Sequence, residues 1–303
     1  MAQASPELLN QQFGIAGQVQ FRSDAGGLPV AIIENQYATA RIALQGAQVV
    51  AFHRHGAKPV LFQSAHAVHA PGKAIRGGIP ICWPWFGAHP SDPAKPQHGF
   101  VRTRMWAVLA TGTLDDGATE VQLGLGDTPE TRALWPHRFQ LLVTVRIGRE
   151  LRVALETRNA GDQPVQVTEA LHTYVAVGNI DALVVRGLEG VEYGDKVDAW
   201  RRKVQEGPIS IAGETDRVYV HTSATCSIDD PVLHRRIYVE KEGSQSTVVW
   251  NPWVERAREF ADFGPDEYRG MICVEVGNAL DDVVTIDAGA FHRLATTIRV
   301  ESL

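Results

Sequence analysis

Cysteine is scarce in this chain of 303 residues, which has only Cys82, Cys226 and Cys273, widely spaced. An odd, scattered set forms neither a disulfide framework nor a zinc-ligand pair, and it indicates reduced, buried thiols. Long apolar runs are also absent, since none approaches the ~20 residues that span a bilayer. The first residues, Met1–Glu7, lack the basic and apolar regions of a secretory signal. We therefore expect a cytoplasmic protein with no membrane partner.

An excess of basic charge is missing too, because the formal net charge is −6. A phosphate backbone requires a basic face, so nucleic acid is not expected as a partner. There is no Walker loop and no alternation of strands with helices, which argues against a nucleotide-binding sheet. Four histidines, His53, His55, His66 and His69, lack matching carboxylates, so we expect no metal site.

What the chain does contain is period-two alternation. In 139–147 the apolar residues at odd positions share one face, and 165–177 is a second long strand-like run. Such runs recur between Gly, Asp and Asn turns, which predicts a large antiparallel β-sandwich. Helix signals are confined to short segments, with a serine or threonine before a proline at Ser5 and Thr128. No linker divides the chain, so we expect a single domain over 1–303.

The segment 71–96 is rich in Gly and Pro and predicts a long, ordered, functional loop. Arg76 stands beside two glycines, and Arg102 ends the nearby run Gln97-His98-Gly99-Phe100-Val101-Arg102. A guanidinium fork matches phosphate or carboxylate, so the two arginines predict an anionic small-molecule ligand. The alternative is that both are solvated surface arginines. Trp83, Trp85 and Phe86 could line such a pocket or fill the core, and the sequence leaves this open.

Two ionisable residues interrupt apolar strand-like runs. His172 lies in Ala-Leu-His-Thr-Tyr, and Glu275 lies in Cys-Val-Glu-Val-Gly. A histidine and a carboxylate suit general acid–base chemistry, because their reference pKa values are near ~6.5 and ~4.3. Judged by burial alone, His172 is a structural strand histidine and Glu275 an exposed edge residue.

These motifs resemble those of the hexose-6-phosphate mutarotases, in the aldose 1-epimerase superfamily, and so do Asp216-Arg217-Val218-Tyr219 and Trp250-Asn251-Pro252-Trp253. The matching motifs extend from Arg76 to Gly277. The resemblance implies an all-β sandwich of the galactose-mutarotase type, and cofactor-free interconversion of the α and β anomers of a hexose 6-phosphate, with glucose 6-phosphate the first candidate. The partner is then a small-molecule hexose phosphate, and we expect a monomer.

The same resemblance implies roles for individual residues. His172 donates a proton to the ring oxygen, and Glu275 takes the proton of the C1 hydroxyl. Arg76 and Arg102 bind the phosphate. Gln97 binds sugar hydroxyls, His98 lies beside the ring, and Asp216 contacts the substrate or orients the histidine. We expect His172 and Glu275 to face one another across a pocket about as wide as a sugar ring.

Three of these residues have structural alternatives: Gln97 and His98 could hold their loop, and Asp216 could cap a turn. Two other functions stay open at this stage. One is epimerisation of unphosphorylated aldoses, and the other is non-catalytic binding of a sugar phosphate on the same fold.

Overall fold

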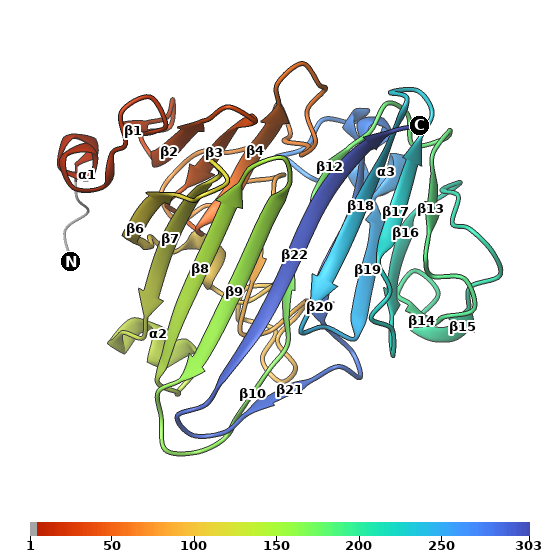
Figure 1. The fold of residues 1–303 in the computed structure, drawn as a ribbon. Coiled ribbons are helices and arrows are strands. Elements are labelled where there is room, and N and C mark those ends of the chain that lie inside the picture. The colour runs from red at the N-terminus through yellow and green to blue at the C-terminus, as the bar shows by residue number, and fades with distance from the viewer. Residues whose placement is uncertain (1–4) are drawn as a thin grey trace.

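The computed structural model describes residues 5–303, and antiparallel strands dominate them. A layer of long strands lies in front of a second sheet, as Figure 1 shows. The front sheet has the order β13-β17-β18-β22-β9-β8-β7-β6. Its strands are β6 Ala107–Thr113, β7 Thr119–Gly126, β8 Phe139–Ile147, β9 Leu151–Asn159, β13 Val184–Arg186, β17 Cys226–Asp230, β18 Arg235–Glu242 and β22 Phe291–Ser302.

The second sheet has the order β15-β14-β16-β19-β20-β11-β5, and β12 also pairs with β20. Its strands are β5 Ile81–Cys82, β11 Glu169–Leu171, β12 Tyr174–Ala176, β14 Glu192–Asp195, β15 Arg201–Val204, β16 Thr215–Tyr219, β19 Ser246–Asn251 and β20 Met271–Asn278. Every residue of β20 is buried. One face of this strand packs on the core, and the other lies under the loops that build the pocket described below.

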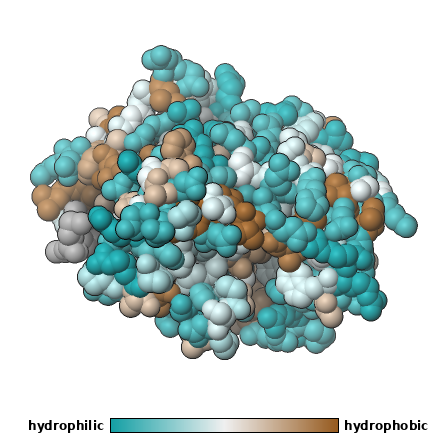
Figure 2. Space-filling view, turned by 90° about the horizontal axis from the view of Figure 1, so that it is seen from below, coloured by the Kyte–Doolittle hydropathy of each residue, from teal (hydrophilic) through white to brown (hydrophobic). Residues whose placement is uncertain are grey.

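Two smaller sheets complete the fold. A four-stranded sheet stands at one end of the sandwich (Figure 1), and a two-stranded one pairs β10 with β21. Their strands are β1 Val19–Ser23, β2 Pro29–Glu34, β3 Ala38–Ala43, β4 Gln48–Arg54, β10 Val165–Val167 and β21 Val284–Ile286. The face shown in Figure 2 is mostly hydrophilic, and its hydrophobic residues lie in separate groups rather than in one broad patch.

The helices of the described residues are short: α1 Pro6–Phe13, α2 Pro129–Leu134 and α3 Trp253–Arg258, with 3₁₀ turns at Val101–Thr103 and Glu267–Gly270. Two begin as the sequence predicts. The Ser5 hydroxyl accepts from the Leu8 amide, and Thr128 forms a capping box with Thr131. None of the helices in 5–303 has the length and apolarity needed to cross a bilayer.

The predicted sandwich is confirmed, and β8 matches its predicted bounds. The expected single strand over 165–177 is wrong, because it is divided into β10, β11 and β12. At the breaks the backbone bonds to the segments on either side of β5: the Thr168 amide donates to the Pro84 carbonyl, and the His172 amide donates to the Pro80 carbonyl. At the second break, His172 lies between β11 and β12 rather than within a strand.

Candidate active site

The register of the second sheet brings His172 and Glu275 together. Leu171 pairs with Val276 at the end of β11, and Tyr174 pairs with Cys273 at the start of β12. The two residues between them therefore continue the same register and place His172 opposite Glu275. Directly opposed residues of an antiparallel pair project to the same face, with Cβ atoms ~4.5–5.5 Å apart. The sheet itself thus aligns the two predicted catalytic groups.

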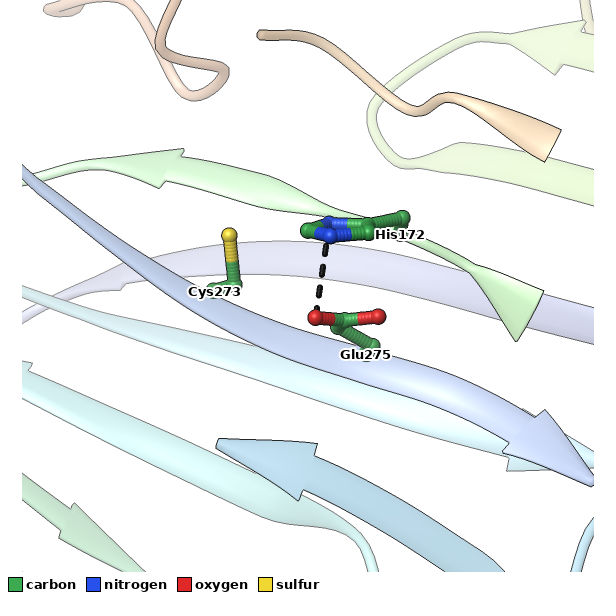
Figure 3. A group of neighbouring side chains, drawn as sticks. All are labelled: His172, Cys273 and Glu275. Atoms are coloured by element: carbon green, nitrogen blue, oxygen red, sulfur yellow. Dashed lines mark ion pairs between the residues drawn. The ribbon is translucent and has the colours of Figure 1, made fainter. Parts of the chain in front are cut away.

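The two side chains are in direct contact: His172 Nδ1 lies 3.3 Å from Glu275 Oε1 (Figure 3). Their side chains are 10% and 1% exposed, respectively. They share a face as expected, but the expected gap of a sugar ring between them is wrong. His172 Nδ1 and Glu275 Oε2 are buried atoms without a hydrogen-bond partner in the protein. Buried polar atoms are normally satisfied, so this pair is set up to meet a ligand.

Burial controls the protonation of the pair. It raises the pKa of Glu275 well above 4.5, Asp216 adds to this rise, and Lys196 opposes it. It lowers the pKa of His172 well below 6.5, and His98, Arg102 and Arg76 lower it further. The charged form of each group is the one that burial disfavours. Burial therefore favours the protonated carboxyl and the neutral imidazole.

Arg76 is anchored on several sides at one end of the site. Its Nε and Nη2 donate to Asp262 Oδ1 at 3.2 and 3.0 Å, and its Nη1 donates to the Tyr174 hydroxyl at 3.2 Å. The guanidinium carbon lies 4.5 Å from the centre of the Phe260 ring. Burial alone would lower the pKa of Arg76, but Tyr174 and Asp262 raise it, so the cation is permanent.

The loop 97–102 forms another part of the pocket lining. Arg102 Nη2 donates to the Gln97 carbonyl at 2.9 Å, and no carboxylate pairs with Arg102 among residues 5–303. His98 and Gly99 are both in the left-handed region, with φ of 63° and 69°. A Cβ at Gly99 would stand 1.7 Å from the Trp83 carbonyl oxygen, so only glycine fits there.

His98 is held at the edge of the pocket. Its amide donates to the Gly87 carbonyl at 2.6 Å, and its ring lies 5.6 Å from that of His172. Burial, together with smaller effects of the cations Arg102, Lys196 and Arg76, lowers its pKa to about 3. The neutral His98 is thus near three positive side chains.

Asp216 and Lys196 form a further part of the pocket lining, where Lys196 Nζ donates to Asp216 Oδ2 at 2.6 Å. Asp216 lies in β16 opposite Trp250 of β19, which in turn lies opposite Cys273 of β20. Its side chain thus rises from the same sheet as the catalytic pair. It does not cap a turn.

All seven site residues named from the sequence line one cavity of about 720 Å³. A volume in the range ~300–1,000 Å³ is typical of small-molecule sites. Its lining also includes Phe86, Tyr174, Lys196, Trp200, Trp250, Arg256, Phe260 and Leu280. Trp83 and Trp85 do not contribute, because both are buried in the core, whereas Phe86 faces the pocket.

The sequence analysis missed Lys196 and Asp262. Neither stands in a recognisable motif, and Asp262 is 186 residues from the arginine that it holds.

Cys273, His172 and Glu275 are the group in the described chain whose donor atoms, all within 4.8 Å of one another, could chelate a metal (Figure 3). Burial raises the pKa of the Cys273 thiol well above 9.0, and Glu275 raises it further. A metal needs the thiolate and the carboxylate, so it must displace two tightly held protons. Arg76, Arg102 and Lys196 add electrostatic repulsion. The donors are close enough, but the charges disfavour a cation.

Comparisons with known proteins agree with this geometry. A sequence model described as aldose 1-epimerase matches residues 29–299. A candidate glucose-6-phosphate 1-epimerase of Cenchrus ciliaris is 36% identical, over 82% of this chain and 78% of that protein. One of Escherichia coli K12 is 34% identical over 90% of each chain.

Solved structures show the same fold. The crystal structure of a candidate mutarotase from Salmonella typhimurium superposes with a TM-score of 0.87, at 32% identity over 94% of each chain. A galactose mutarotase related enzyme of Lactobacillus acidophilus has a TM-score of 0.73 at 14% identity, covering 90% of this chain and 97% of its own. The latter likeness places the fold in the galactose-mutarotase type.

Proposed function

Because this chain belongs to the aldose 1-epimerase family, we propose that it interconverts the α and β anomers of a hexose 6-phosphate, with glucose 6-phosphate the first candidate. One observation carries the proposal: a buried histidine–carboxylate pair with unsatisfied atoms lies in a pocket whose lining includes the cationic side chains of Arg76, Arg102 and Lys196. The pair supplies the acid and the base, and the cations supply the phosphate site.

The reaction needs one proton removed and one delivered. Glu275 takes the proton from the C1 hydroxyl while His172 gives one to the ring oxygen. The C1–O bond of the ring breaks, and C1 becomes an aldehyde carbonyl. After rotation about C1–C2, the reverse transfers close the ring on the other face. The ring oxygen and the C1 hydroxyl are bonded to the same carbon, so two groups in contact can reach both.

This step uses a carboxylate and an imidazolium, and together they contain as many protons as the neutral carboxyl–imidazole pair that burial favours. A shift of one proton from Glu275 to His172, across the 3.3 Å contact, converts one into the other. A phosphate near Arg76 and Arg102 assists this shift, because its negative charge offsets the cations that lower the pKa of His172.

Arg102, Arg76 and Lys196 are the proposed phosphate ligands, and Gln97 and Asp216 the proposed partners of the sugar hydroxyls. A hydrogen bond to a charged group contributes ~1.5–3 kcal/mol. Two such bonds give about 3–6 kcal/mol, or roughly 10²–10⁴ in preference over the free sugar.

Epimerisation of an unphosphorylated aldose is the second candidate. Arg76 is paired with Asp262 and Lys196 with Asp216, so two of the three proposed phosphate ligands are partly neutralised by carboxylates of the protein. Arg102 lacks such a partner, which favours the phosphorylated substrate. We also propose that the chain works as one domain and as a monomer in the cytoplasm. Since ring opening and closure require only an acid and a base from the protein, we propose that the reaction uses no cofactor.

Saturation transfer between the α and β anomeric protons, measured by NMR, tests the proposal. The rate with glucose 6-phosphate is compared with that with glucose, using Arg102→Gln as a matched loss of one cation. Faster exchange on the phosphate, with a preference that Arg102→Gln reduces, supports the proposal. Equal rates on both sugars would favour the second candidate. No acceleration on either sugar would favour a binding protein.

A further inference from the structure

Tyr174 contacts both halves of the site. Its ring lies flat against the imidazole of His172, with centroids 4.8 Å apart and planes 9° from parallel. Its hydroxyl accepts the bond from Arg76 Nη1 at 3.2 Å. The residue lies two positions after His172 and therefore projects to the same face. One side chain thus joins the proposed phosphate ligand to the proposed acid.

The position of this tyrosine is tightly fixed. Tyr174 is 2% exposed. The Trp250 ring packs edge-on against it, with ring centroids 5.9 Å apart, and edge-on against His172, with centroids 6.1 Å apart. Arg76 is fixed as well, by Asp262 and by the Phe260 ring. A shift of Arg76 is transmitted to the tyrosine through the hydroxyl, and from the tyrosine to the imidazole through the stack. Close-packed protein interiors transmit small displacements.

We infer that Tyr174 is a positioning residue, through which an oxyanion on Arg76 raises the turnover rate of the His172–Glu275 pair. This rests on the proposed function and adds to it. A phosphate that served only as a handle would change affinity alone. A phosphate coupled through Tyr174 also aligns the acid with the ring oxygen, and such interactions raise kcat.

The coupling can be tested with the anion and the sugar as separate molecules. Anomeric exchange of glucose is measured by NMR at increasing inorganic phosphate, at constant ionic strength, with chloride as the control salt. We expect phosphate to accelerate exchange by wild type several-fold. Tyr174→Phe keeps the ring stack and loses the hydroxyl, so its acceleration falls to less than half.

Steady-state kinetics on glucose 6-phosphate give a second measurement. We expect kcat of Tyr174→Phe to fall about tenfold, as for one hydrogen bond to a charged group, with a smaller change in KM. The matched control is Tyr219→Phe, which removes a buried hydroxyl bonded to Gln205 Oε1 at 2.7 Å, on a residue outside the pocket lining. It should keep the wild-type kcat and the wild-type response to phosphate.

The outcomes separate this inference from the proposed function. If Tyr174→Phe raises KM at unchanged kcat, or responds to phosphate as wild type does, the tyrosine merely holds Arg76 and the coupling is refuted. If wild type exchanges glucose and glucose 6-phosphate equally well, the proposed phosphate specificity is itself wrong. Thermal unfolding of each variant confirms that it is folded, and the ring volume kept by Phe makes a folded protein the expected result.

Discussion

Replacing Glu275 by glutamine should slow catalysis by about a hundredfold or more and leave the fold intact. The amide has the same shape as the carboxyl group, and the side chain is almost fully buried in the middle of β20. It cannot take the proton of the C1 hydroxyl. Its polar atoms can still meet His172 Nδ1, so the substitution removes the base with little other change.

The expected loss of rate follows from the role of Glu275 as a general base. General bases contribute about 10²–10⁴-fold to a rate, which corresponds to about 3–5 kcal/mol of transition-state stabilisation at about 1.36 kcal/mol per factor of ten. The loss should appear in kcat, because the proton is taken only in the transition state. Binding of glucose 6-phosphate at the arginines should change little.

The same substitution should preserve or increase the free energy of unfolding at pH 8, although it slows catalysis. The pKa of Glu275 in the folded protein is raised above its value of 4.5 in the unfolded chain. Its contribution to stability is therefore fully present below pH 4.5 and is lost as the pH rises through the folded-state pKa. Glutamine does not ionise, so at pH 8 the variant should have a free energy of unfolding equal to or greater than that of wild type.

The assay is saturation transfer between the anomeric protons of glucose 6-phosphate, together with urea unfolding at pH 5 and pH 8. Glu169→Gln is the matched control, since Glu169 is also fully buried but contacts Thr157 and His292 outside the pocket. It should retain the wild-type exchange rate. A folded Glu275→Gln protein that exchanges within a factor of about five of wild type would refute the role of base, because the loss expected is ~10²-fold or more.

Three further predictions follow from the same contacts. Arg102→Gln should raise KM for glucose 6-phosphate about tenfold, with a smaller change for glucose, because it deletes a charged hydrogen-bond donor; initial-rate kinetics on both sugars measure this. Burial raises the pKa of Glu169 to about 8, so its contribution to stability, a few kcal/mol, is present below about pH 4.5 and lost by about pH 8; urea unfolding of Glu169→Gln across this range should show a flatter pH dependence than wild type. Trp83→Ala should cost about 3–5 kcal/mol in the free energy of unfolding, since the ring is fully buried 4.5 Å from Phe139 and 5.0 Å from Trp135; a loss below 1 kcal/mol would contradict its place in the core.

Local patterns predicted the parts of this structure that local forces determine. The period of two gave β8, and the caps at Ser5 and Thr128 gave the starts of two helices, because each signal involves residues near in sequence. The prediction of a single strand over 165–177 was wrong. Its apolar residues continue through two breaks, where the backbone bonds to Pro80 and Pro84 instead. Only tertiary structure contains those contacts.

The site shows the same division. His172 and Glu275 could be named because they interrupt apolar runs and match a family pattern, but their 3.3 Å contact depends on the register of β11, β12 and β20. Trp83 and Phe86 look alike in sequence, yet one fills the core and the other lines the pocket. Only folding decides between them.

The catalytic pair and the cations are supported by different parts of the fold. His172 and Glu275 rise from the pairing of β20 with β11 and β12, where backbone hydrogen bonds and burial fix the position of both. Arg76 and Arg102 come from segments outside that sheet, and Arg76 is held by Asp262 from a third. Substitutions in these segments can therefore change the preference for phosphate without moving the acid and the base. Tyr174 links the two parts, because its hydroxyl is hydrogen-bonded to Arg76 and its ring is stacked on His172.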